Sequence, residues 1–247
     1  MRCNPERRKR MRILLVNDDG ISAPGLAALA RTAVRFGEVW VVTPDHQCRG
    51  MSHKLTLFEE MHVSCSDFPV LVKDAFSVGG TPADCVKIAL DSLLPERPDY
   101  VFSGVNDGWN AGFDIAYSGT IGACYEAVMN GIPAIAFSTM GRGGYACAER
   151  HMPALTEELL ALGQGRGEIW NLNFPADEPK GVLYDRRIAP MQLYNGLYSK
   201  RKADGGAELY SQRGVPCARA DVPDGTDIAA VLDGYISVGR IQSGVMC

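Results

Sequence analysis

Two neighbouring aspartates at the end of an apolar run are the residues of this chain best suited to chemistry. Residues 13–16, Ile-Leu-Leu-Val, form a continuous apolar run typical of a strand that is buried on both faces. Asn-Asp-Asp-Gly follows at residues 17–20, and Pro24 then opens a stretch with helical spacing. Ligands of open α/β sheets bind at such junctions, and the hard oxygens of Asp18 and Asp19 favour Mg²⁺ or Mn²⁺. The alternative is an Asx-rich turn with solvated acids.

Two further polar clusters lie at corresponding junctions. Residues 106–110, Asn-Asp-Gly-Trp-Asn, come after a predicted strand at 100–103, and Ser-Gly-Thr at 118–120 precedes a predicted helix at 121–130. In a doubly wound sheet these junctions converge on one edge, where glycine N–H groups and a helix N-terminus attract anions. Ser-Gly-Thr alone is also an ordinary helix cap. Acids for a metal together with N–H donors for a phosphate nevertheless indicate a metal-assisted phosphate hydrolase.

The order of the elements predicts the scaffold that holds these clusters. Strand-like runs alternate with helical stretches through residue 173, which predicts an α/β fold with a doubly wound, mainly parallel sheet, a Rossmann-like three-layer arrangement. A second strand is expected at 39–42, followed by a polar loop at 46–53 in which Gly50 permits close approach of the backbone. The chain has 247 residues, and we expect residues 11–247 to form one α/β domain.

Two segments fall outside this alternation. Residues 1–10 contain a basic cluster without the apolar stretch of a signal peptide, so we expect a disordered tail, with Met1 and Met11 both open as the functional start. Residues 190–216 contain three tyrosines and a Gly-Gly turn signal. They predict a β-hairpin that leaves the body of the domain and pairs with another subunit. A long mobile surface loop is the alternative for this segment.

Composition and missing motifs exclude several classes of protein. The formal net charge of −4 gives no general footprint for nucleic acid, and no apolar run reaches the length of a membrane span. Eight cysteines without a Cys-x-x-Cys pair are interpreted as free thiols. The chain has neither a P-loop motif nor a Gly-x-Ser-x-Gly nucleophile elbow. We therefore expect neither duplex nucleic acid nor a membrane among its partners.

Several specific blocks occur in one order between Met11 and about residue 238. They are Asn17-Asp18-Asp19-Gly20, Ala23-Pro24-Gly25, Pro44-Asp45, Gly80-Thr81-Pro82-Ala83-Asp84-Cys85-Val86, Ser103-Gly104-Val105-Asn106, Asn110, Gly112, Tyr117-Ser118-Gly119-Thr120, Gly225-Thr226-Asp227 and Gly234-Tyr235. In these blocks the chain resembles the SurE-like 5′/3′-nucleotidases, the survival protein E family.

The resemblance implies an enzyme of the cytoplasm that hydrolyses nucleoside 5′-monophosphates, and possibly 3′-monophosphates, with one divalent metal ion such as Mg²⁺ or Mn²⁺ per subunit. It implies a homodimer or homotetramer assembled through the projecting hairpin. The family's metal ligands fall on Asp18, Asp19 and Asn106, of which the two aspartates are also the implied catalytic residues. The implied phosphate contacts are Gly50, Asn110, Ser118, Gly119 and Thr120.

One position departs from the family pattern. The family usually has a serine metal ligand in the loop after the second strand, and this chain has Arg49 there. A guanidinium has no acceptor atom for a cation. Water could replace the missing ligand, the loop could shift so that Ser52 approaches, or the site could be weakened. The alternative function is therefore a non-catalytic or weakly active relative that binds nucleotide or phosphate.

Overall fold

The apolar run at residues 13–16 lies inside a nine-stranded sheet. In the computed structural model, which describes residues 10–203 and 205–243, β1 (Met11–Val16) pairs in parallel with β2 (Gly37–Pro44) and β5 (Tyr100–Asp107). The sheet order is β3-β4-β2-β1-β5-β6-β7-β11-β8. The other strands are β3 (Val63–Cys65), β4 (Asp74–Val78), β6 (Ala134–Thr139), β7 (Glu168–Asn173), β8 (Val182–Arg186) and β11 (Ile236–Gln242).

Neighbouring strands from β4 to β7 are all parallel, whereas β3 and β11 run antiparallel to β4 and β7. The predicted doubly wound, mainly parallel α/β sheet is therefore confirmed.

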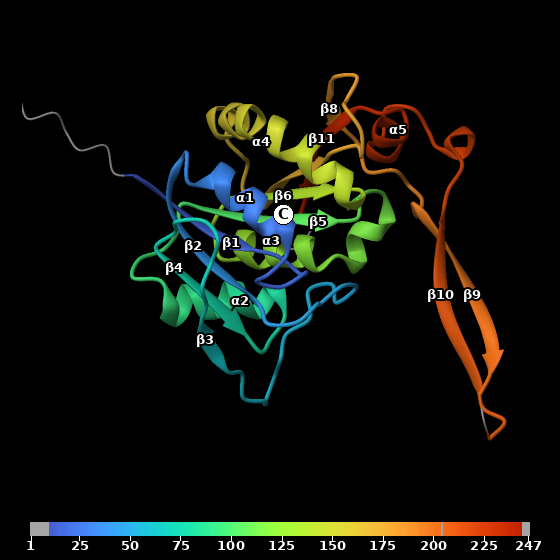
Figure 1. Cartoon of the computed structure of the whole chain (residues 1–247). Coiled ribbons are helices and arrows are strands. Elements are labelled where there is room, and N and C mark those ends of the chain that lie inside the picture. Colours follow the sequence, from blue (N-terminus) through green and yellow to red (C-terminus); the bar gives the residue numbers. More distant parts are fainter. Residues whose placement is uncertain (1–9, 204, 244–247) are drawn as a thin grey trace, which may run out of the picture.

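Helices cover both faces of this sheet (Figure 1). The helices α1 (Pro24–Ala33) and α4 (Gly141–Leu162) lie on one face, and α2 (Pro82–Ile88) and α3 (Gly119–Met129) lie on the other. Alternate residues of β1 enter the two cores, as strand geometry requires. Ile13 and Leu15 pack on the α1 and α4 side, and Leu14 and Val16 pack on the α2 and α3 side. The strand end that carries the aspartates is thereby fixed from both faces.

The ends of two helices can be compared with expectation. The spacing of Thr81 and Asp84 in the sequence predicts a capping box at the start of α2, and the structure confirms it: Thr81 caps the helix through its side chain, and the Asp84 carboxylate accepts from the Thr81 N–H at 2.9 Å. The sequence pattern predicts a further helix over residues 153–162, which is too short, because α4 begins at Gly141 and contains Pro153 in its interior. Glycines in its first turn and an internal proline disguise its helical pattern.

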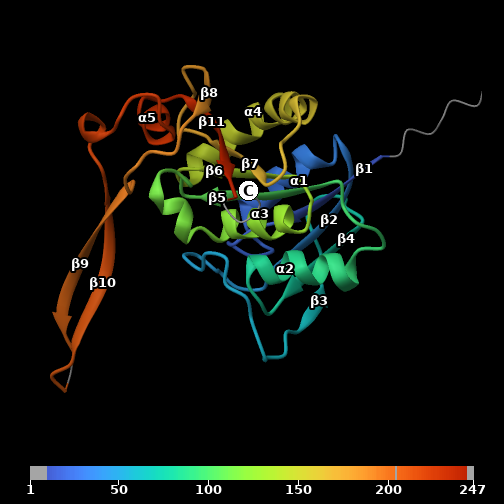
Figure 2. The same cartoon turned by 180° about the vertical axis from the view of Figure 1, so that it is seen from behind.

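The predicted hairpin is present as a separate two-stranded sheet. The strands β9 (Tyr194–Lys202) and β10 (Glu208–Pro216) are antiparallel and extend from the body of the protein (Figure 2). Tyr198 and Tyr210 are exposed on it. The short helix α5 (Asp227–Leu232) packs near its base. The pairing of this hairpin with another subunit stays a prediction.

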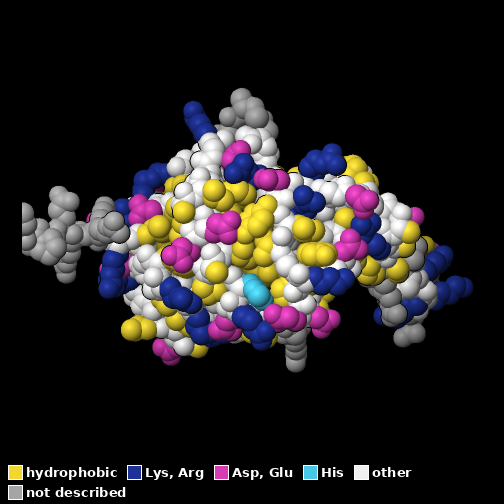
Figure 3. All heavy atoms as spheres, turned by 90° about the horizontal axis from the view of Figure 1, so that it is seen from above, with side chains coloured by type: hydrophobic (Ala, Val, Ile, Leu, Met, Phe, Trp, Pro, Cys, Tyr) yellow, Lys and Arg dark blue, Asp and Glu magenta, His cyan; other side chains and the backbone are white. Residues whose placement is uncertain are grey.

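The surface over α1 and α4 mixes charges of both signs (Figure 3). Lysine and arginine side chains are interspersed there with aspartates, glutamates and apolar groups, so this face presents no extended basic area. Within the described ranges no helix is both long and apolar enough to cross a membrane. The expected basic tail lies outside the described residues except for Arg10.

Candidate active site

A tight turn holds the two aspartates at the end of β1. The buried Asn17 side chain donates to the Gly20 carbonyl at 3.0 Å and accepts from the Gly20 N–H at 3.2 Å. Gly20 has a φ of +92°, a left-handed conformation that favours glycine. The Asx turn of the alternative interpretation is therefore present, but neither of its two aspartates is solvated. Asp18 is only 2% exposed, and the Asp19 side chain only 10%.

Asp18 packs against the first turn of α3. Its Oδ1 accepts a hydrogen bond from the Thr120 hydroxyl at 2.8 Å. A Cβ on Gly119 would lie 2.9 Å from the Asp18 Cβ, so only glycine allows this approach. Burial, with the nearby Asp19 charge second, raises the pKa of Asp18 to about 6. An acid so placed is stabilised in its ionised form by a cation.

Asp19 faces a different set of groups. Its Oδ1 lies 3.4 Å from Nη2 of Arg49 and 3.3 Å from Nε2 of Gln47, and its Oδ2 accepts from the Asp107 N–H at 3.4 Å. The loop after β2 therefore brings Arg49 to the aspartates, as its place in the sheet predicts. The guanidinium occupies the neighbourhood in which the family pattern expects a ligand hydroxyl.

Asn106, near the end of β5, offers an unused acceptor. The residue is 8% exposed, and its Nδ2 donates to the Gly108 carbonyl at 2.7 Å. Its Oδ1 is buried and finds no hydrogen-bond partner in the part of the chain that the structure describes. Buried acceptors are rarely left without a partner unless an ion or water supplies one. Two carboxylates and an amide oxygen fit a hard divalent cation such as Mg²⁺ or Mn²⁺.

In the part of the chain that the structure describes, histidine and cysteine offer no competing metal site. Among residues 10–203 and 205–243, no group of three or more His, Cys, Asp or Glu side chains could hold a metal ion. The set that fits a cation here depends on an asparagine instead.

The predicted phosphate contacts gather beside these acids. Ser118 caps α3, its hydroxyl accepting from the Ile121 N–H at 3.1 Å. Gly50 has a φ of +74° and open space around its Cβ position. The side chain of Asn110, 5% exposed, donates to the Ser138 hydroxyl at 2.7 Å. These residues share one pocket of about 360 Å³, whose lining also includes Asp18, Arg49 and Asn106.

Three predicted site residues lie just behind that lining. Asp19 contacts Arg49, which lines the pocket. Gly119 packs against the Asp18 side chain, and the Thr120 hydroxyl donates to Asp18. Sequence reasoning gave no site role to the residues of the pocket's outer wall, which are Trp109, Asp114, Tyr117, Met140 and Tyr194, although Trp109 and Tyr117 stand in stretches that it singled out. Tyr117 had a local signal, because it directly precedes Ser-Gly-Thr. Tyr194 had none, because it reaches the pocket from the base of the hairpin.

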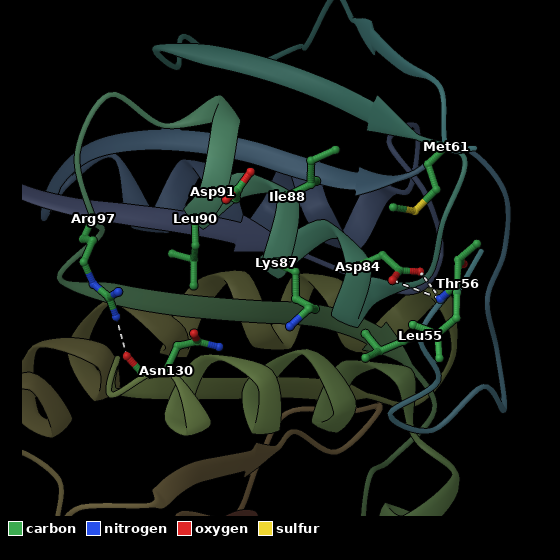
Figure 4. A pocket seen from close by; sticks show the side chains of 11 residues that line it. Leu55, Thr56, Met61, Asp84, Lys87, Ile88, Leu90, Asp91, Arg97 and Asn130 are labelled. Atoms are coloured by element: carbon green, nitrogen blue, oxygen red, sulfur yellow. Dashed lines mark hydrogen bonds between the residues drawn. The ribbon is translucent and has the colours of Figure 1, made fainter. Parts of the chain in front are cut away.

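A larger pocket of about 510 Å³ lies between α2 and α3 and contains none of the predicted site residues (Figure 4). Its charged side chains pair within the protein. Lys87 points from α2 to the Glu126 carboxylate on α3, 3.2 Å away, and Arg97 donates to the Asn130 carbonyl. Asp84 accepts from the Thr56 N–H at 3.1 Å. The larger volume therefore does not coincide with the predicted site residues, which lie in the smaller pocket.

Comparison with known proteins identifies the family of this chain. The family model described as "Survival protein SurE" matches residues 13–193. A protein of Heliobacterium modesticaldum named "5'-nucleotidase SurE" is 39% identical, over 94% of this chain and 86% of its own length. One of Brucella canis with the same name is 38% identical, over 92% and 91%. The crystal structure of the SurE protein from Aquifex aeolicus superposes with a TM-score of 0.79 at 34% identity, covering 94% of this chain and 93% of that one. The chain belongs to the SurE family.

Proposed function

We propose that the protein is a divalent-metal-dependent phosphomonoesterase that hydrolyses nucleoside 5′-monophosphates, and possibly 3′-monophosphates, to nucleoside and phosphate. The observation that carries the proposal is the buried, unpartnered Oδ1 of Asn106 on the same pocket as Asp18. An acceptor in that state, beside two carboxylates, suits a cation more than it suits a structural core. The nucleotidase names of the relatives support the same activity.

Asp18, Asp19 and Asn106 would hold Mg²⁺ or Mn²⁺. Such an ion, when bound, polarises a phosphate oxygen and lowers the pKa of a water for in-line attack. Ser118 and Gly119 begin α3, whose N-terminal N–H groups and dipole favour an anion. Gly50 lines the pocket with open space beside it, so its backbone can approach a phosphate closely.

The outer wall of the pocket supports a nucleoside rather than inorganic phosphate as the leaving group. Trp109, Tyr117 and Tyr194 offer aromatic surface there, and Met140 adds a polarisable sulfur. Tyr117 is 56% exposed, so its ring is accessible to a flat base. Aromatic surface stacks on any base, which suits an enzyme with broad base preference.

A second function deserves a test because of Arg49. Its contact with Asp19 supplies a positive charge without a metal, as expected of a weakly active relative that binds phosphate or nucleotide. The same guanidinium also suits a substrate phosphate, which it can bind in a bidentate fork. We favour the hydrolase, because the contact leaves the Asn106 acceptor unsatisfied.

We further propose that residues 11–247 act as one domain and that the hairpin assembles a homodimer or homotetramer. A two-stranded hairpin is marginally stable alone, and exposed Tyr198 and Tyr210 would gain a covering surface from a second copy. Action in the cytoplasm is supported by the free thiols of the six described cysteines.

The proposed function is tested by phosphate release from nucleoside 5′- and 3′-monophosphates and from an aryl phosphate. We expect release from the 5′-monophosphate that stops with a chelator and returns with Mn²⁺ or Mg²⁺. Release that persists in chelator would contradict metal dependence. Binding of a nucleoside monophosphate without any turnover would establish the alternative function.

A further inference from the structure

The loop after β2 brings Arg49 and Gly50 to the active-site pocket, and it is fastened on both sides of them. On one side, the Cys48 N–H donates to the Asp18 carbonyl at 2.7 Å, which ties the loop to the aspartate turn. On the other side, the Ser52 N–H donates to the Tyr117 carbonyl at 3.0 Å. Residues 49–51 therefore form a short arch between two fixed points, and this arch faces the pocket.

The second fixed point, the Tyr117 carbonyl, lies in a short 3-10 helix (Phe113–Tyr117) directly before α3, whose first turn is the proposed phosphate cradle. A Cβ on Gly122 would lie 2.3 Å from the Ser52 carbonyl oxygen, so α3 accepts the loop only because it has glycine there. The Ser52 hydroxyl donates to the Ala116 carbonyl at 2.7 Å. Ser52 itself has a φ of +55°, a left-handed conformation that a serine rarely adopts without support.

That support continues at His53. Its Nε2 lies 2.9 Å from Oε2 of Glu126, which is four residues beyond Gly122 and hence on the same side of α3. Glu126 is only 3% exposed, and its other oxygen accepts from Lys87 at 3.2 Å and from the Asn130 side chain at 2.9 Å. A buried carboxylate satisfied in this way is a rigid anchor, because breaking any of its bonds leaves a buried charge undersatisfied.

We propose that His53 is a positioning residue for phosphate hydrolysis: its hydrogen bond to Glu126 sets the distance between the 49–51 arch and the first turn of α3. The inference rests on the proposed function. His53 does not line the pocket and so acts through Gly50 and Arg49. Without the bond, the Ser52 end of the arch keeps its hydrogen bonds to Tyr117 and Ala116 but loses the support of the next residue, so the arch can shift against the phosphate cradle.

Lys87 provides a matched control. It binds the same carboxylate as His53, but from α2, and among the described residues it makes no hydrogen bond or ion pair with the loop at 46–53. Removing either partner weakens the Glu126 anchor, whereas only removal of His53 withdraws the support of the arch beside Ser52. If His53 only stabilised the fold, removal of His53 and removal of Lys87 would have the same effect on KM and on phosphate inhibition.

The experiment compares wild type, His53→Ala, His53→Gln and Lys87→Met for hydrolysis of a nucleoside 5′-monophosphate, for inhibition by inorganic phosphate and for Tm. We expect His53→Ala to raise KM and weaken phosphate inhibition by about tenfold, since misplaced binding groups lose affinity and rate steeply. His53→Gln, which keeps an N–H donor, should recover part of that loss. Lys87→Met should lower Tm and leave both constants within about twofold.

An unchanged KM in His53→Ala, or an equal rise in Lys87→Met, would overturn the proposal. If His53→Ala does not fold, the comparison of His53→Gln with Lys87→Met decides by the same criterion. A wild-type protein that releases no phosphate would instead refute the proposed function, and it would be recognised before any variant is compared.

Discussion

Replacement of Arg49 by serine separates the two opposing effects of its charge. The guanidinium lies 3.4 Å from Asp19, one of the proposed metal ligands, and its side chain is 55% exposed. Coulomb's law gives roughly 1 kcal/mol for unit charges at this distance in water, and more at a lower dielectric. Because the group is half-exposed, we take about 1 kcal/mol as the advantage that Arg49→Ser gives to a competing cation.

This free energy corresponds to roughly a fivefold tighter dissociation constant for Mn²⁺. Titration calorimetry of Mn²⁺ into chelator-treated protein measures it directly. The Michaelis constant for a nucleoside monophosphate should rise in the same variant, because the phosphate loses a bidentate partner.

Two further variants identify the cause. Arg49→Ala removes the charge without adding an oxygen ligand, and Arg49→Lys keeps the charge. If charge is what opposes the metal, serine and alanine should both tighten Mn²⁺ binding, and lysine should not. Tightening by serine alone would mean that a ligand hydroxyl was restored. The reasoning is refuted if neither the Mn²⁺ constant nor the Michaelis constant moves in any of the three.

Three other perturbations give separate tests. Joining Asn195 to Val215 through two glycines, in place of residues 196–214, should yield monomers with a folded core; an unchanged mass by light scattering would refute the assembly role. Gly119→Ala should displace Asp18 and lower activity at least tenfold, because the new Cβ would meet its side chain at 2.9 Å. Burial works to raise the pKa of Glu126, but hydrogen bonds from His53 and Lys87 leave that pKa lowered. Its stabilisation is therefore present above the ordinary glutamate pKa and lost as the pH falls through the lowered one. Urea unfolding should thus show the largest destabilisation by Glu126→Gln at neutral pH, shrinking below about pH 4; a pH-independent difference would contradict this.

The scaffold of the site was predictable because its signals are local. The apolar run at 13–16 and the polar stretch that follows specify a buried strand and its end, whatever the rest of the chain does. Parallel topology then brings the ends of β1 and β5 to one edge, so the proximity of Asp18 and Asn106 follows. The Thr81 cap was predictable for the same reason, since its partner Asp84 lies three residues away.

The outer wall of the pocket was not predictable, because long-range packing determines it. Tyr194 and Met140 meet there, with the Tyr194 hydroxyl 3.5 Å from the sulfur, although no local pattern links the hairpin to the start of α4. The antiparallel direction of β11 likewise results from its pairing with β7, and the residues of β11 alone do not indicate this direction. Nor does sequence indicate that the oxygen rather than the nitrogen of the Asn106 amide is left free.

The most direct measurement is phosphate release from a nucleoside 5′-monophosphate by chelator-treated wild type and Asp19→Asn, before and after addition of Mn²⁺. We predict no release by either protein before Mn²⁺ is added. Afterwards we predict activity of the wild type and a loss of ~10²-fold or more in Asp19→Asn, equivalent to about 3 kcal/mol of transition-state stabilisation. Full activity of Asp19→Asn in chelator-treated buffer would contradict the metal-dependent site.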